Sequence, residues 1–173
     1  MPGRLAVVCV VVILVVAVPC GVLLRARPAP AAGSIVLFVG ARVPGDFLAP
    51  GQPPACPGAP CAAAWPLVCT SDRTVAGFYL QVGAPSAAAV LGPVGQSLAA
   101  NWTEFAASGL PAGIARASVW TGCAGNTCDD FTSTSGVGDV GGLCTAGLSL
   151  FSASETAACS GSLRVLCGCY AAA

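Results

Sequence analysis

The chain has 173 residues, seven basic and seven acidic side chains, and therefore a formal net charge of zero at neutral pH. Charged residues make up 8% of the sequence, against about 25% in an average soluble domain. This composition argues against nucleic acid as a partner, which needs clustered Lys and Arg. The chain has no histidine, which excludes Ser-His-Asp and Cys-His catalytic groups and removes the commonest zinc ligand.

The first 32 residues form a separate unit. Residues 5–24 read LAVVCVVVILVVAVPCGVLL and carry no charge, and arginines flank them on both sides. About 20 apolar residues in a helix can cross a hydrocarbon core of roughly 30 Å. We therefore expect a single transmembrane helix from Leu5 to Leu24, then a short Pro/Ala linker and one folded domain over residues 33–173. A cleaved signal peptide, whose apolar region is usually about 7–15 residues, and a buried core helix are the alternatives.

The first half of the domain combines short apolar runs with a long loop. Ser34–Gly40 (SIVLFVG) is apolar and β-branched, which predicts a strand. Residues 44–60 are rich in Pro and Gly and predict a loop. Residues 61–69 could begin as a helix that Pro66 limits. Gly77–Val82 (GFYLQV) predicts a second strand.

The second half continues the same pattern. Residues 87–101 mix loop and helix signals, and Ser118–Thr121 predicts a short strand. Leu148–Ser152 and Leu163–Cys167 predict the closing strands, and we expect Arg164 to reach loop carbonyls or a carboxylate from the last of these. Helices are few, so the sequence predicts an α+β domain that is loop-rich and needs covalent staples.

A glycine-rich stretch follows residue 135. Gly136, Gly138 and Gly141 spell G-x-G-x-x-G, the pattern of a dinucleotide-binding loop. Such a loop must follow an apolar strand and open a helix, whereas residues 132–135 are polar and no helix signal comes after Gly142. The stretch instead predicts a surface loop whose glycines adopt positive φ.

Nine of the 11 cysteines lie in the domain. This density behind a membrane-targeting segment indicates a disulfide framework in an oxidising compartment. A zinc site is the rival, but the close spacings are C-x4-C and C-x-C, not the C-x2-C of zinc knuckles. Reduced cytosolic thiols are the third possibility. If disulfides form, the domain faces the lumen or the exterior, and the odd number leaves at least one cysteine free or bonded to another chain.

Two glycosylation signals are present. Asn101-Trp102-Thr103 is an N-x-T acceptor sequence, and Asn126-Thr127-Cys128 is the rarer cysteine form. We expect a glycan at Asn101 and not at Asn126, because the acceptor sequence of Asn126 includes Cys128, which is expected to be engaged in a disulfide. A glycan here agrees with an extracellular domain.

Several stretches between Ser34 and Tyr170, taken in order, resemble a family of uncharacterised secreted or surface-anchored domains of bacteria and large DNA viruses. The most diagnostic are P-V-x-x-x-L-A-x-N-W at residues 93–102, C-x-x-F-T-S-x-S-G-x-G-x-x-G at 128–141 and C-x-x-x-x-R-V-x-C at 159–167. The fold of that family is related to C-type lectins and to the endostatin-like collagen domain. The resemblance implies a disulfide-stapled C-type-lectin-like domain in which the glycine-rich stretch is part of a long loop.

The resemblance also implies nested disulfides, with Cys69 joined to Cys167 and Cys128 joined to Cys159. The chain departs from the family in its further cysteines at 56, 61, 123, 144 and 169. We expect Cys56 to pair with Cys61 and Cys123 to pair with Cys144, which leaves Cys169 over.

Four residues near the long loop are candidates for ligand contact. They are Trp120, Asp129, Asp130 and Asp139. The E-P-N, Q-P-D and W-N-D motifs of calcium-dependent lectins are absent, although the three carboxylates could bind a hard cation. We expect a solvated loop, with no metal and no other cofactor.

Taken together, these features predict a membrane-anchored, non-catalytic module that binds a protein or glycan outside the cell or on a virion surface. A purely structural component of an envelope or virion is the alternative. A hydrolase that uses loop carboxylates is a third, disfavoured because Asp129 and Asp130 are adjacent and project differently.

Overall fold

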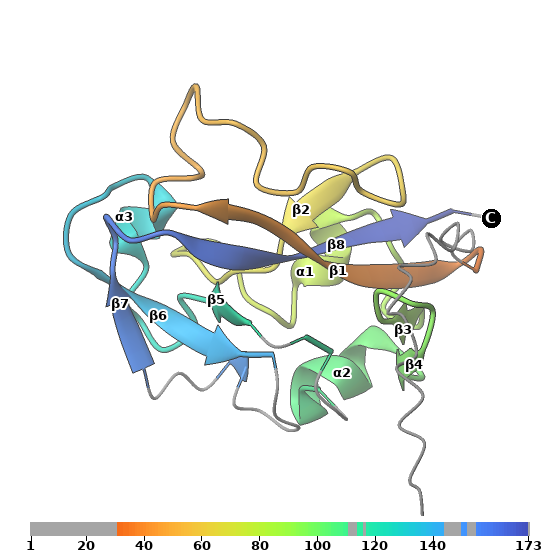
Figure 1. Ribbon diagram of the computed structural model, residues 1–173. Coiled ribbons are helices and arrows are strands. Elements are labelled where there is room, and N and C mark those ends of the chain that lie inside the picture. The colour runs from red at the N-terminus through yellow and green to blue at the C-terminus, as the bar shows by residue number, and fades with distance from the viewer. Residues whose placement is uncertain (1–30, 111–113, 116, 144–149, 152–154, 173) are drawn as a thin grey trace, which may run out of the picture.

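A computed structural model describes residues 31–110, 114–115, 117–143, 150–151 and 155–172. The described chain is a mixed α+β domain, mostly sheet with short helical segments (Figure 1). The elements in chain order are β1 (Ser34–Val43), β2 (Ala64–Pro66), α1 (Phe78–Gln81), β3 (Ala89–Leu91), β4 (Ser97–Ala99), α2 (Trp102–Ser108), β5 (Ser118–Trp120), α3 (Cys128–Phe131), β6 (Val137–Gly142), β7 (Glu155–Ala158) and β8 (Leu163–Ala171).

The strands form one sheet in the order β4-β3-β1-β8-β5-β6-β7, and β2 adds to β8 beside β5. The two long strands β1 and β8 run antiparallel through its middle (Figure 1). β3 joins β1 and β5 joins β8 in parallel, and the other pairs are antiparallel. The pairing of β1 with β8 shifts register between Val39 and Arg42, which marks a β-bulge.

The core occupies both faces of the sheet, because alternate residues of β1 point to opposite sides. On one face Ile35 and Leu37 pack in a cluster with Phe78 of α1 and with Trp102 and Phe105 of α2. On the other face Val36 and Phe38 pack with Phe47, Trp120 and Phe131. The sheet is therefore buried between α1 and α2 on one side and α3 and the loop at residues 44–60 on the other (Figure 1).

The expected strands at Ser34–Gly40, Ser118–Thr121 and Leu163–Cys167 are confirmed as β1, β5 and β8. The expected strand at Gly77–Val82 is wrong, since the segment forms the single turn α1. Phe78 and Val82 lie four residues apart, both are buried, and one helical turn places them on the same side. Phe78 packs against Gly168 of β8, where an added Cβ would lie 2.7 Å from the ring.

Three other local expectations differ from the structure. Residues 61–69 contain the strand β2, which pairs with β8, and show no helix. Residues 87–101 form β3 and β4, which pair with each other. Of the strand expected at residues 148–152, only Leu150 and Phe151 are described, and neither lies in a strand.

The glycine-rich stretch forms a strand, which corrects the expectation of a surface loop. Residues 138–141 of β6 are buried between β5 and β7. A Cβ at Gly138 would lie 2.6 Å from Cys128 Sγ, and a Cβ at Gly141 would clash with the Leu150 carbonyl. Gly136, before the strand, has φ of +83°. Close packing explains two of these glycines, and left-handed backbone explains the third.

Among the described residues, four disulfides connect eight cysteines: Cys56–Cys167, Cys61–Cys169, Cys69–Cys123 and Cys128–Cys159. The expected pair Cys128–Cys159 is confirmed, and the other three expected pairs are wrong. Cys144, the expected partner of Cys123, lies outside the described residues.

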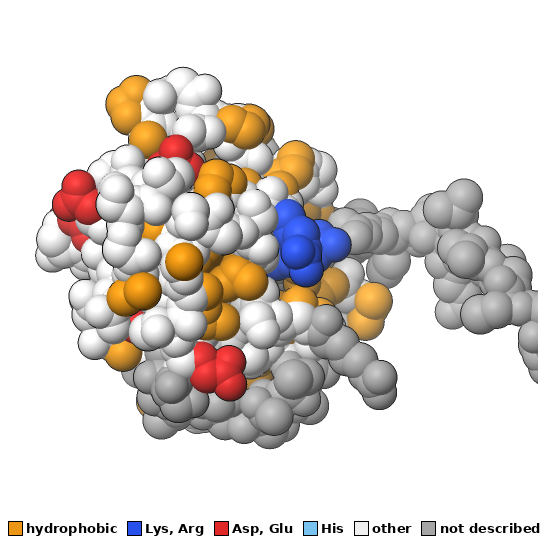
Figure 2. All heavy atoms as spheres, turned by 60° about the vertical axis from the view of Figure 1, so that its left-hand side comes forward, with side chains coloured by type: hydrophobic (Ala, Val, Ile, Leu, Met, Phe, Trp, Pro, Cys, Tyr) orange, Lys and Arg blue, Asp and Glu red, His pale blue; other side chains and the backbone are white. Residues whose placement is uncertain are grey.

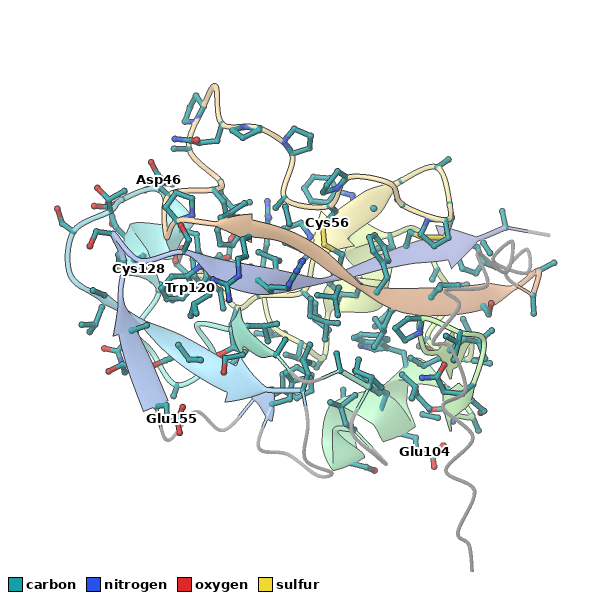
Figure 3. The ribbon with its side chains drawn as sticks, viewed as in Figure 1. Asp46, Cys56, Glu104, Trp120, Cys128 and Glu155 are labelled. Atoms are coloured by element: carbon teal, nitrogen blue, oxygen red, sulfur yellow. A yellow bond between two sulfur atoms is a disulfide. The ribbon has the colours of Figure 1, made fainter. Side chains whose placement is uncertain are left out.

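Two cysteines on one face of β8 explain the first two pairs. Residues 167 and 169 lie two apart on β8, so their side chains project to the same face. The loop that carries Cys56 and Cys61 covers that face, and each of its cysteines bonds to one cysteine of the strand (Figure 3). Cys56 and Cys61 therefore close two long loops, of sequence separation 111 and 108, and not a small local ring.

Cys69 cannot reach Cys167, because Pro66 already lies opposite Cys167 in the pairing of β2 with β8. Three residues farther along, the Cys69 amide donates to the Thr121 carbonyl at 2.7 Å. This places Cys69 beside Cys123, to which it is bonded.

Within the described residues, no helix has the length and apolarity to cross a membrane. The anchor expected at Leu5–Leu24 lies outside those residues.

Candidate ligand-binding cleft

A cleft of about 640 Å³ opens between residues 69–76, which follow β2, and residues 122–130, which follow β5. Hydroxyl groups of Thr70, Ser71, Thr74 and Thr127, the Arg73 side chain and the Asp130 carboxylate line it. The disulfide Cys69–Cys123 joins the two walls, with 4.9 Å between its Cα atoms. The cleft therefore combines these polar groups with apolar lining residues such as Val75 and Phe151, and a disulfide joins its walls.

The segment Cys128–Phe131, labelled α3, is a left-handed turn. All four residues have φ between +52° and +60°, a conformation that costs about 1–2 kcal/mol per residue for side chains other than glycine. Asp tolerates this region better than most residues, which suits Asp129 and Asp130. Cys128 and Phe131 need other support, and the surrounding contacts supply it.

Anchors at both ends hold the left-handed turn. Cys128 is bonded to Cys159, and the buried Phe131 ring packs 4.8 Å from the ring of Phe47. The Thr127 hydroxyl accepts a hydrogen bond from the Asp130 amide at 3.0 Å, and the Phe131 carbonyl accepts one from Leu48 at 2.9 Å. Strained backbone that neighbours hold in place is common at functional sites, and this turn aims Asp130 at the opposite wall of the cleft.

Asp130 is the carboxylate of the cleft. The Ser71 amide donates to its Oδ1 at 2.8 Å, and the Ser71 hydroxyl donates to its Oδ2. These bonds, with smaller contributions from Thr127 and the positive charge of Arg73, hold the pKa of Asp130 below its ordinary value of 3.8. Asp130 is consequently an ionised acceptor at neutral pH and a weak proton acceptor for catalysis.

Asp139 does not line the cleft, but its carboxylate holds one wall of the cleft in position through hydrogen bonds. Only 1% of it is exposed, and its carboxylate accepts hydrogen bonds from the amides of Ala124 and Asn126 and from the Asn126 side chain, at 2.8–3.0 Å. Its own backbone bonds to Thr121 and Asn126. The expectation that Asp139 lies in a solvated loop is therefore wrong, since it is a buried residue that positions the loop at residues 122–126.

Trp120 and Asp129 also lie outside the cleft lining. Trp120 is fully buried and donates from Nε1 to the Val43 carbonyl at 3.0 Å. Figure 3 places it beside Cys128, at the end of the sheet that α3 covers. Asp129 is exposed and accepts a long hydrogen bond, 3.5 Å, from Thr132. Of the four expected ligand residues, only Asp130 lines the cleft.

An aromatic residue that the sequence reasoning missed lies next to the cleft. Trp65 of β2 is 39% exposed, whereas the other two tryptophans are fully buried. The Arg73 guanidinium lies over its ring, 5.4 Å from the ring centre, within the range of a cation–π contact. Arg73 also lies 3.8 Å from the Asp72 carboxylate. We call Trp65 and Arg73 the aromatic platform.

The platform connects the cleft to a second hollow. Arg73 lines the cleft, while Trp65 lines a smaller hollow of about 240 Å³ together with Pro53, Pro54 and Pro66. The disulfides of Cys56 and Cys61 fix the loop that forms this hollow to β8. A ligand on the platform would thus meet a surface that is largely organised before binding.

The glycosylation signal coincides with a helix cap. Asn101 is the N-cap of α2, and its side-chain oxygen accepts from the Glu104 amide at 2.8 Å. Glu104 in turn accepts from the Ala100 amide at 3.0 Å, which resembles a capping box. The Asn101 oxygen has a structural role, whereas a glycan would attach to its nitrogen.

The remaining acidic side chains do not form a catalytic pair. Asp46, Glu104 and Glu155 lie well apart (Figure 3). Among the described residues, no group of three or more Cys, Asp or Glu side chains is placed to hold a metal ion. The cleft therefore offers hydrogen-bond partners, and the aromatic ring of the platform adjoins it.

Comparison with protein-family models, curated proteins and solved structures gave no match.

Proposed function

We propose that this chain is a membrane-anchored, disulfide-stabilised module that binds an extracellular carbohydrate at the cleft and its aromatic platform. The observation that carries the proposal is the exposed Trp65 ring, stacked with Arg73 beside a hydroxyl-lined cleft. Sugar rings present apolar faces to aromatic side chains, and their hydroxyls donate to carboxylates. The Trp65 ring and Asp130 would supply these two partners, and Arg73, which lies over the ring and lines the cleft, connects them.

The rigidity of the site and the protonation state of Asp130 agree with a binding role. The disulfide Cys69–Cys123 joins the walls, and the two hydrogen bonds from Ser71 fix the Asp130 carboxylate. A preorganised site loses little conformational entropy on binding. The lowered pKa of Asp130 makes it a poor general base, so a hydrolase that uses this carboxylate is disfavoured.

The disulfides support an oxidising compartment, since such bonds rarely persist in the cytosol. The apolar segment at residues 5–24 then serves as the anchor, with the domain displayed on the lumenal or extracellular side. The resemblance of the sequence to a family of surface-anchored domains agrees with a domain displayed outside the cell. That this domain has a C-type-lectin-like fold is part of the proposal.

A glycan array probed with the full chain in detergent micelles tests the carbohydrate assignment. We expect selective binding to a small set of oligosaccharides, with quenching or enhancement of Trp65 fluorescence on titration. A Trp65→Phe variant removes the exposed indole signal and leaves the two buried tryptophans as the reference. Binding to no glycan on the array, together with capture of a protein component of an envelope or particle, would favour the structural role instead.

A further inference from the structure

Two arginines lie directly opposite each other near one end of the central strand pair. Arg42 of β1 is the register partner of Arg164 of β8, immediately after the bulge in β1. Directly opposite residues on antiparallel strands project to the same face, with Cβ atoms about 4.5–5.5 Å apart. Both side chains are exposed.

The guanidinium of Arg164 is held by a carbonyl group within the bulge of β1. Its guanidinium nitrogen Nη1 donates to the Gly40 carbonyl at 3.2 Å, so the expected contact with a carbonyl is confirmed, although the carbonyl belongs to β1 and not to a loop. One side of the guanidinium is thereby anchored to the strand, and its other N–H groups remain available for a second partner.

No carboxylate side chain neutralises this pair. All seven acidic residues of the chain lie within the described ranges, and the single ion pair among those ranges joins Arg73 to Asp72. Figure 2 shows the basic side chains of one face gathered in one patch, set apart from the acidic ones. Like charges directly opposite each other on a sheet are destabilising, so the pairing has a cost that a bound anion would remove.

We propose that Arg42 and Arg164 form a binding site for one discrete oxyanion, a sulfate or phosphate group such as an ester on a larger ligand. Arginine presents planar N–H forks that match such oxygens, and bonds between charged partners are among the strongest hydrogen bonds. Two guanidinium groups on facing strands offer forks to two sides of one tetrahedral group. Neither residue lines the cleft, so the site is separate from the proposed carbohydrate site.

The charge content of the chain favours a discrete group over a charged surface. Binding to an anionic membrane draws on clusters of basic residues, each worth only about 1 kcal/mol. The chain has a net charge of zero and no lysine, so its long-range attraction to a polyanion is weak. Two arginines can nevertheless recognise a single sulfate or phosphate by direct hydrogen bonding.

Calorimetric titration of the full chain in neutral detergent, with sulfate and phosphate at constant ionic strength, tests the proposal. We expect saturable binding that weakens about tenfold in Arg42→Gln and in Arg164→Gln, since one charge-assisted bond is worth about that factor. Arg4→Gln is the matched control, because it removes the same charge at the far end of the apolar segment from the domain and should bind like the parent chain. Arg42→Gln spares the Gly40 contact and guards against a folding defect in Arg164→Gln.

Two further arms identify the source of the anion. A sulfated and a phosphorylated monosaccharide show which ester is preferred, and a preference for either supports the site. Vesicles with phosphatidylserine test the membrane alternative. Absence of saturable anion binding, equal loss in Arg4→Gln, or Arg42-dependent binding to vesicles without binding to the soluble anions would overturn the proposal.

Discussion

Ser71 and Asp130 are 59 residues apart in the sequence, and Ser71 donates hydrogen bonds to both carboxylate oxygens of Asp130, from its amide and from its hydroxyl. This contact ties the segment after β2 to the left-handed turn at Cys128–Phe131. It also explains why the turn can persist, since the same carboxylate that the strained backbone presents is held by the opposite wall of the cleft.

The first prediction concerns the pH dependence of this contact. The folded-state pKa of Asp130 is lowered from 3.8, so the contribution of Asp130 to stability is present above the ordinary pKa and is lost as pH falls through the lowered value. Asp130→Asn should therefore be less stable than the parent chain at neutral pH, and the difference should narrow below about pH 4. Urea unfolding at a series of pH values measures this, and a constant difference would contradict the assignment.

The second prediction concerns the two disulfides that fasten the Pro/Gly loop to β8. Cys56–Cys167 and Cys61–Cys169 close nearly the same long loop. When one of them is removed, the other still closes that loop, so the loss of unfolding free energy is limited. Replacing one pair by Ala should cost about 2–3 kcal/mol, since only a short further loop is released, whereas replacing both should cost more than the sum of the two.

Cys128–Cys159, with a sequence separation of 31, provides the comparison for this series. Its removal should cost about 3–4 kcal/mol, because none of the other three disulfides among the described residues closes that loop. Urea unfolding of the four variants, which lack either long-range pair, both of them, or Cys128–Cys159, checks the order. If loss of Cys61–Cys169 alone proves as damaging as loss of both long-range pairs, the redundancy is wrong.

The third prediction concerns the glycines of β6. Gly138→Ala places a methyl group against Cys128 Sγ and the Trp120 ring, and overpacking of this kind typically costs about 1–3 kcal/mol. Gly77→Ala is the control, because its added Cβ meets only Thr74 at ordinary distance. Thermal unfolding should show a clear loss for Gly138→Ala and little change for Gly77→Ala, and equal effects would argue against close packing at this strand.

The fourth prediction concerns the side of the membrane on which the domain lies and the glycosylation of Asn101. Expression of the full chain with microsomal membranes should add a glycan to Asn101, seen as a mass shift that an endoglycosidase removes. Asn101→Asp should abolish the shift and retain the fold, because Asp is as good an N-cap as Asn. The proposed orientation would be contradicted if the parent chain carries no glycan and its domain is digested by protease added to the cytosolic side of the microsomes.

The sequence predicted a mixed α+β domain with disulfides and three of its strands, because β1, β5 and β8 are short apolar runs whose burial follows directly from their composition. It failed at Gly77–Val82, where Phe78 and Val82 fit either a strand or one helical turn and only the packing on Gly168 decides between them. It also failed at β6, where glycines typical of loops are required by the Trp120 ring and a disulfide that lie next to them in space.

The disulfides show where further reasoning from the sequence was possible. Cys167 and Cys169 stand in C-x-C spacing within a predicted strand, and two side chains on one face of a strand need two partners from one covering segment. Cys56 and Cys61 in the Pro/Gly loop fit that requirement. The aromatic platform was beyond reach, because the exposure of Trp65 depends on β2 lying beside β8 and no local pattern distinguishes it from the two buried tryptophans.

If the cleft and its aromatic platform form a binding site, removal of the Trp65 ring must weaken ligand binding. The affinity of the full chain for the strongest array oligosaccharide should be compared in the parent chain, in Trp65→Ala and in Leu80→Ala. Leu80 is 69% exposed and lies outside the cleft lining, so it controls for the loss of an exposed apolar side chain. We predict at least about tenfold weaker binding for Trp65→Ala, as for an aromatic residue at a binding hot spot, and unchanged binding for Leu80→Ala. Equal affinities in all three proteins would contradict the account.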